Sequence, residues 1–170
     1  MSDVGHKISY RWLILSGFVC LVSFGCHNVK EPVSRLSLAD PATSNQLLSG
    51  FSWLESNSWR WTARKFSAAL QPPENAEQRG ATLYLHLYIP DSQIESLGPM
   101  TLTATAEGRS LLPETFLKGG TYIYTREIPR DLMVTSILPV KFSFDKAVSA
   151  EDADGRELAA IVTSIDLEAN

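Results

Sequence analysis

The stretch Ala81–Pro90, ATLYLHLYIP, decides the fold class of this chain. From position 83 every second residue is a large aliphatic one, and the residues between them are two tyrosines and a histidine. An extended strand points successive side chains to opposite faces, so this alternation predicts a strand with one buried and one open face. The expected buried face consists of Leu83, Leu85, Leu87 and Ile89.

The same two-residue period recurs on both sides of this stretch. Strands are expected over residues 61–70, 101–106, 121–128, 137–145 and 159–167. In the last of these, one face should carry Ile161, Thr163, Ile165 and Leu167. Glu107-Gly108 has the composition of a two-residue hairpin turn, and the only helical pattern falls around residues 149–154. Short strands with turns about every ten residues predict an all-β fold, an antiparallel, jelly-roll-like β-sandwich.

The first 26 residues have a different character. Lys7 and Arg11 precede an apolar run over residues 12–26, which ends at Gly25-Cys26. The run is short for a membrane span, which needs about 20 residues, and it fits the apolar region of an export signal. It resembles a bacterial lipoprotein signal, which implies lipid attachment at Cys26 and an outer-membrane location where a cell has two membranes. An uncleaved membrane anchor and ordinary signal cleavage remain as alternatives.

These features divide the chain into three parts: a signal peptide over residues 1–25, a lipid-anchored flexible tether over 26–50, and a β-sandwich domain over 51–170. The tether is assigned because its sequence is rich in Ser, Asn and Pro and shows no clear period. Both cysteines, Cys20 and Cys26, lie before the domain, which must therefore fold without disulfides.

Composition narrows the function. The chain carries a net charge of −4, which argues against nucleic acid as a partner. His86 is the single histidine after residue 27, and no nucleophile motif accompanies it. With so few histidine and cysteine ligands we expect no metal and no cofactor. The sequence therefore predicts a protein that is not an enzyme.

Two aromatic or charged segments stand out near the ends of the expected domain. The first runs from Gly50 to Trp61 and includes Trp53, Glu55, Trp59 and Arg60; the second includes Asp154, Arg156 and Leu158. Together they resemble a β-sandwich module found beside bacterial glycosyltransferases and other sugar-related envelope proteins. The resemblance covers residues 50–168 and implies a jelly-roll-like sandwich without implying a reaction.

These residues allow two interpretations. In the structural one, Arg156 pairs with Glu55 or Asp154 to close a corner of the sandwich, and Leu158 enters the core. In the functional one, the aromatic rings of Trp53, Trp59 or Trp61 stack on a sugar, while Glu55 and Arg60 bind its hydroxyl groups.

The open face of the deciding strand is a further candidate. Tyr84, His86 and Tyr88 should lie side by side there, and such aromatic faces suit glycans or partner proteins. The sequence thus favours a non-catalytic binding or assembly module of the cell envelope, with carbohydrate as the first ligand to consider. An envelope interaction or structural subunit without a sugar ligand is the alternative, and a small glycan-active enzyme is the third.

Overall fold

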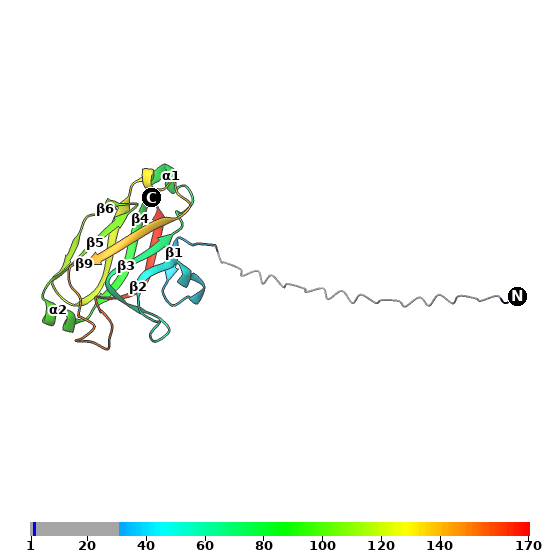
Figure 1. Ribbon diagram of the computed structural model, residues 1–170. Helices are drawn as coiled ribbons and strands as arrows, with labels where there is room; N and C mark the ends of the chain where they lie inside the picture. Colours follow the sequence, from blue (N-terminus) through cyan, green and yellow to red (C-terminus); the bar gives the residue numbers. More distant parts are fainter. Residues whose placement is uncertain (1, 3–30) are drawn as a thin grey trace.

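The computed structural model describes residues 31–170 together with Ser2. The expectations for the export signal and for Cys26 concern residues outside this part. Within it, no helix is both long and apolar enough to cross a bilayer. The chain alternates strands with a few short helices (Figure 1), in the order β1 (Arg35–Ser37), η1 (Pro41–Gln46), β2 (Leu47–Phe51), β3 (Arg60–Leu70), α1 (Ala76–Arg79), β4 (Ala81–Ile89), α2 (Asp91–Leu97), β5 (Met100–Ala106), β6 (Arg109–Ser110), β7 (Glu114–Phe116), β8 (Gly120–Ile128), η2 (Arg130–Leu132), β9 (Leu138–Phe144) and β10 (Ile161–Ala169).

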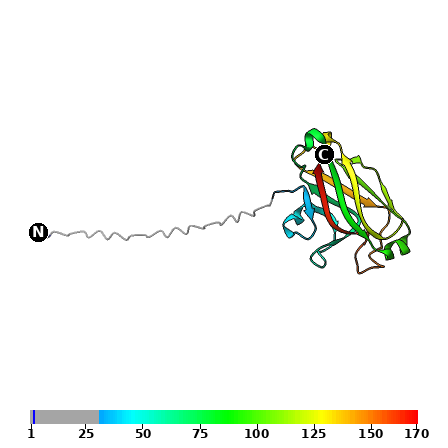
Figure 2. The same ribbon diagram turned by 180° about the vertical axis from the view of Figure 1, so that it is seen from behind.

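The strands form one curled, wholly antiparallel sheet of ten strands that folds into two layers, which confirms the expected antiparallel β-sandwich. The β4 layer contains β8, β4, β10 and β1, and the β9 layer contains β2, β3, β9, β5, β6 and β7. Strand β3 joins them, because its first residues pair with β10 and residues 65–70 pair with β9. Figure 2 shows the β4 layer from the front, with β10, β4 and β8 side by side.

The core lies between the inner faces of the two layers. The aliphatic face predicted for β4 is there, since Leu83, Leu85 and Ile89 are fully buried and Leu87 is 2% exposed. The β9 layer contributes aromatic rings, with Phe66 stacked on Phe142 at a centroid distance of 4.8 Å. Burying large apolar side chains contributes about 1.5–3 kcal/mol each, so this core supplies the main driving force for folding without disulfides.

The domain begins earlier than the sequence analysis placed it. Strand β1 pairs with β10, and Leu36 within it and Leu38 directly after it are 0% and 1% exposed. The buried Gln46 side chain donates to the carbonyl of Ala69 at 2.7 Å, which fastens η1 to β3. Residues 35–50 therefore belong to the folded domain, and assigning them to a flexible tether was wrong. Residues 35–50 show no hydrophobic period because they form a short edge strand and a 3-10 turn, and neither is long enough to display one.

The predicted face of the last strand was partly wrong. The pairing of β10 with β4 shifts register between Val162 and Ser164, which marks a bulge. Before the bulge Val162 is buried and Thr163 is exposed; after it Ile165 and Leu167 are buried, as expected. An extra residue reverses which side chains point inward, and its position depends on the partner strands. Around residues 149–154 the chain forms turns and no helix, because the Val148–Leu158 bridge closes this segment into a compact loop.

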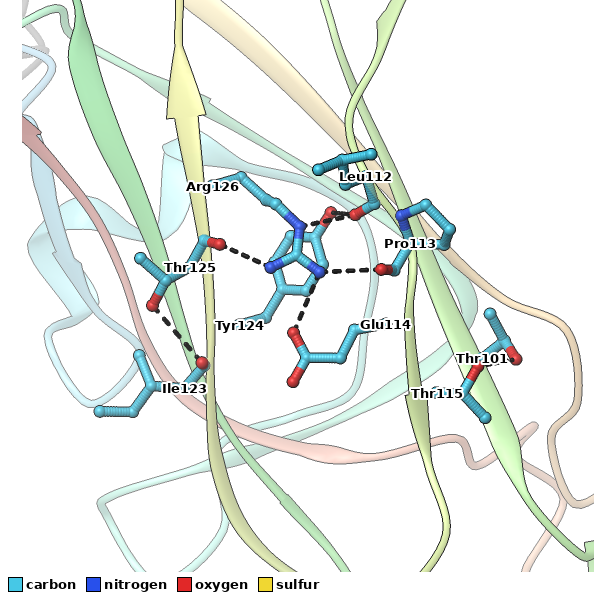
Figure 3. Close-up of polar contacts among 9 residues, drawn as sticks. All are labelled: Thr101, Leu112, Pro113, Glu114, Thr115, Ile123, Tyr124, Thr125 and Arg126. Carbon is cyan, nitrogen blue, oxygen red and sulfur yellow. Dashed lines mark hydrogen bonds and ion pairs between the residues drawn. The ribbon is translucent and has the colours of Figure 1, made fainter.

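An arginine braces one open edge of the sandwich (Figure 3). From β8, the Arg126 guanidinium donates to the carbonyl oxygens of Leu112 at 2.6 Å and Pro113 at 2.9 Å. It also donates to the Glu114 carboxylate at 3.0 Å and lies 4.0 Å over the Tyr124 ring. The Tyr124 hydroxyl donates to the same Leu112 oxygen at 2.9 Å. These contacts tie the edge strand of the β4 layer to the segment between β6 and β7 of the β9 layer.

Candidate functional site

The ion pair expected at the sandwich corner is present, and it involves both proposed partners. Arg156 donates to the two oxygens of Asp154 at 2.7 and 2.5 Å and to Glu55 Oε1 at 2.6 Å. These hydrogen bonds from Arg156 hold the pKa of the Asp154 carboxyl below its usual range. They also raise the pKa of the guanidinium itself, the bond to Asp154 contributing most. The three side chains therefore join the loop after β2 to the loop before β10.

Trp53 belongs to this corner but not to the core. Its side chain is 61% exposed, and the Arg156 guanidinium lies 4.1 Å over its ring. Because one ring face is already taken by the arginine, only the opposite face is open to a ligand. Glu55 opens the tight hairpin that leads to Trp59, to which it is joined by a backbone hydrogen bond of 2.9 Å.

The Arg60 guanidinium is hydrogen-bonded to backbone carbonyls. It donates to the carbonyls of Leu38 at 3.3 Å and Ser52 at 2.9 Å. Trp59 and Trp61 flank it, with their rings edge to face at a centroid distance of 6.4 Å. Both rings are half-buried. The expected grouping of the aromatic residues is thus split: Trp53 lies on the arginine at the corner, and Trp59 and Trp61 lie on β3 and its start.

The open face of β4 carries the expected trio of Tyr84, His86 and Tyr88 on the outside of the β4 layer. His86 Nε2 lies 3.7 Å from Asp166 Oδ2, and the same carboxylate accepts a hydrogen bond from Ser164 at 2.8 Å. A shallow hollow of about 320 Å³ is lined by Tyr84, His86 and Asp166 with two neighbouring side chains, Ile123 and Glu168. The serine contacts the carboxylate and not the imidazole, so no nucleophile is activated here in the manner of a catalytic triad.

A larger pocket of about 620 Å³ is lined by residues of α2 and of the loop before β10. We call it the α2 pocket. Trp61 lines it from β3, while the loop contributes Ser149, Asp152 and Leu158. Helix α2 contributes Ser92, Gln93, Ser96 and Leu97. Leu158, expected in the core, is half-buried in the lining, because the Val148–Leu158 bridge holds it outside the layers.

Gln93 is the notable side chain of the α2 pocket. The residue is 5% exposed, and its Oε1 atom is buried without a hydrogen-bond partner among the described residues. Buried polar atoms are nearly always paired with protein, ordered water or a ligand, and an unpaired one costs about 1–3 kcal/mol. Gln93 is one of the residues that line the α2 pocket, so the pocket lies beside a side chain whose acceptor has no partner among the described residues.

Two hydrogen bonds join other polar groups of the α2 pocket. The Ser149 hydroxyl donates to the Asp152 carboxylate at 2.6 Å, and the Ser96 hydroxyl donates to the backbone carbonyl of Gln93 at 3.2 Å. Of the residues that line the α2 pocket, Trp61 was singled out from the sequence as a ligand-binding candidate and Leu158 as a core residue, whereas Gln93 and the serines of α2 were not. A short polar helix after a strand carries no motif, and the lining comes from segments far apart in the chain. Within residues 31–170, no three carboxylate, histidine or cysteine side chains group to hold a metal ion.

No protein-family model and no curated protein matches the chain. Among solved structures it is similar to dimeric latent PorU from Porphyromonas gingivalis, with 15% identity and a TM-score of 0.41, over 72% of this chain and 12% of that one. It is also similar to a family GH115 4-O-methyl-α-glucuronidase with specificity for decorated arabinogalactans, with 6% identity and a TM-score of 0.46, over 83% of this chain and 18% of that one.

A third similar structure is the carbohydrate-binding module CBM36 in complex with calcium and xylotriose. It is 8% identical with a TM-score of 0.42, and the alignment covers 80% of this chain and all of that module. At these identities and TM-scores the comparisons assign no family and no ligand. The chemistry of the site has to be read from its own side chains.

Proposed function

We propose that this protein is a non-catalytic carbohydrate-binding module that binds a saccharide in the α2 pocket. The observation that carries the proposal is the buried, unpartnered Oε1 of Gln93 in a pocket lined by the Trp61 side chain. A sugar offers hydroxyl donors for such an acceptor and an apolar ring face for an aromatic side chain.

The remaining lining agrees with a polyhydroxylated ligand. Ser92 supplies a hydroxyl group that both donates and accepts. The Ser96 and Ser149 hydroxyls already donate within the protein, so they can accept from a ligand, and Asp152 supplies a further acceptor. Leu97, Ala147 and Val148 add apolar surface beside them. A mixture of one aromatic side chain, aliphatic surface and a few fixed polar groups gives orientation and specificity to a neutral ligand.

The pocket is poorly equipped for hydrolysis of a glycosidic bond. That reaction uses a pair of carboxyl groups about 5–10 Å apart, and Asp152 is the single acidic residue in the described lining. Asp152 is also committed to the Ser149 hydroxyl. These two facts support binding without catalysis.

The decisive test is a glycan-binding screen followed by calorimetric titration of the Gln93→Met variant. Methionine keeps the volume but cannot accept the hydrogen bond, so we expect binding to weaken at least fivefold. The same change should leave thermal stability equal or higher, because it removes an unsatisfied buried atom. Trp61→Leu should also weaken binding, whereas Trp53→Leu, outside the pocket, should not. Wild-type affinity in Gln93→Met would overturn the assignment of this pocket.

A second candidate is a protein-interaction subunit that uses the outer face of the β4 layer. Tyr88 is 40% exposed and Ile123 is 51% exposed on that face, beside His86. Such apolar surface favours a protein partner over solvent. If Ile123→Glu abolishes assembly with envelope proteins while glycan binding is absent in the wild type, this second function replaces the first.

The location of the protein is proposed from the sequence alone. The apolar run and Gly25-Cys26 support export and lipid attachment at Cys26, with the folded domain displayed at the cell envelope. The Cys26→Ser variant should lose the mass of the lipid and leave the membrane fraction. An unchanged mass and unchanged partitioning would contradict the anchor.

A further inference from the structure

A second hollow lies on the opposite layer from the β4 face. It is a shallow groove of about 260 Å³ across β3, β9 and β5, on the outside of the β9 layer. It shares no lining residue with the α2 pocket. The core residues Phe66, Ala104 and Phe142 form its floor, and the side chains around it stand on the outer face.

These outer side chains are of two kinds only, lysines and hydroxyl residues. The lysines are Lys65 and Lys141, and the hydroxyl residues are Ser49, Ser67, Thr103, Thr105 and Ser143. No carboxylate belongs to the described lining, although acidic residues outnumber basic ones in the chain by 19 to 15. A ligand in the groove therefore meets positive charge and hydroxyl groups without a competing anion.

The two lysines are placed to act together. Lys65 pairs in register with Ser143, and Lys141 pairs with Ser67 on the adjacent strand. This makes them diagonal neighbours on one face, with Cβ atoms about 7–8 Å apart. Thr103 and Thr105 pair with Ser143 and Lys141 on the other side of β9, so hydroxyl groups continue the face across a third strand.

Neither lysine has a counter-ion within the part of the chain that the structure describes. Among residues 31–170, no hydrogen bond or ion pair is found for the ammonium group of either Lys65 or Lys141. Lys146 behaves differently, because its ammonium donates to two backbone carbonyls, at 3.0 and 2.7 Å. Two unneutralised like charges on one face repel each other, and an anion bound between them would remove that repulsion.

We propose that this groove binds an acidic glycan segment, with a carboxylate or sulfate group between Lys65 and Lys141 and sugar hydroxyls on the serine and threonine side chains. This site is additional to the α2 pocket and does not depend on it. A glycan is favoured over nucleic acid because no exposed aromatic side chain stands in the groove to stack on bases.

The test is calorimetric titration of the full chain with polygalacturonate oligomers, dextran sulfate, neutral dextran and single-stranded DNA. We expect one or both acidic glycans to bind, and the two acidic probes distinguish carboxylate from sulfate recognition. The Lys65→Gln/Lys141→Gln double variant should raise the dissociation constant at least tenfold, and raising the salt concentration should weaken the wild type in the same direction.

Lys118→Gln is the charge control, because it removes one positive charge from an exposed lysine outside the groove, as each of the single variants Lys65→Gln and Lys141→Gln does within it. It should bind like the wild type, as should Trp61→Leu, which separates this site from the α2 pocket. Exposed lysines carry little stability, so unfolding midpoints should not change. The proposal is overturned if neither acidic glycan binds, if the control weakens binding as much as the double variant, or if neutral dextran or DNA binds equally well.

Discussion

The arginine brace at the edge of the sandwich makes the sharpest prediction about stability. Arg126→Met keeps most of the apolar stem and removes the guanidinium, which makes four hydrogen bonds. One of these, to the carbonyl of Thr125 at 2.6 Å, is local and adds little to the joining of the two layers. The three others, to residues 112–114, connect β8 with the β6–β7 segment.

The expected magnitude follows from how well these groups are shielded. The Arg126 side chain is 17% exposed and Glu114 is 34% exposed, so water can rehydrate the glutamate after the change. Leu112 keeps its bond from Tyr124, which leaves Pro113 as the carbonyl without a partner. Three bonds with a charged donor, discounted for this rehydration, amount to about 2–3 kcal/mol of unfolding free energy. For a domain of this size that corresponds to a midpoint lowered by roughly 6–9 °C.

Thermal and urea unfolding, followed by circular dichroism and tryptophan fluorescence, measure this loss. Arg109→Met is the matched control, since Arg109 also bonds a carboxylate through two nitrogens, at 2.6 and 3.3 Å. That pair is 48% and 59% exposed, so water replaces its hydrogen bonds and its loss should lower the midpoint much less. If both variants unfold at the same midpoint, the shielding argument is refuted and the brace contributes no more than a surface ion pair.

Three further results are expected. Gly50→Ala should prevent folding or lower the free energy of unfolding by more than about 3 kcal/mol, because φ is +74° and a Cβ would lie 2.1 Å from a backbone oxygen of β3. Gly108 has a similar φ of +79° but nothing within 4 Å, so Gly108→Ala should lower the free energy of unfolding in urea by only about 1–2 kcal/mol. The bond to Arg156 lowers the pKa of Asp154, so the stabilisation from this carboxylate is present above the unfolded pKa near 4 and is lost as pH falls. Arg156→Met should therefore reduce the dependence of the unfolding free energy on pH in the acid range. An unaltered pH dependence in that range would contradict this. Burial raises the pKa of Tyr124, so the contribution of its protonated hydroxyl to stability is full below the unfolded pKa near 10 and disappears at higher pH. An absorbance titration of tyrosinate should lose its late-titrating component in Tyr124→Phe. A curve identical to that of the wild type would show that Tyr124 is not the late-titrating tyrosine.

Much of the fold could be predicted because alternation is a local property. The faces of β4 and β5 are as expected, since Leu83 and Leu102 lie inward with every second residue after them. The hairpin at Glu107-Gly108 was also predicted correctly, and φ is positive at both residues. Side chains alternate between the two faces of any regular strand, so the buried face of such a strand can be predicted from its own sequence.

Features that depend on a partner strand escaped prediction. Leu36 is buried because β1 pairs with β10, which lies well over a hundred residues later in the chain. The bulge between Val162 and Ser164 is a property of the ladder with β4, and it changed the face expected for Ile161. No pattern within three or four residues of β1 or of the bulge carries this information.

The sequence alone determined the antiparallel β class and the position of most strands, because these follow from two-residue alternation. It named Glu55 and Asp154 as alternative partners of Arg156, and the fold brings both carboxylates to the guanidinium. The tertiary structure alone decided which polar groups become a site. Gln93 is left without a partner, and Lys65 and Lys141 face one groove, only because segments distant in the chain meet there. The burial of an amide and the grouping of two ammonium groups on one face are properties of that assembly, and no residue carries them on its own.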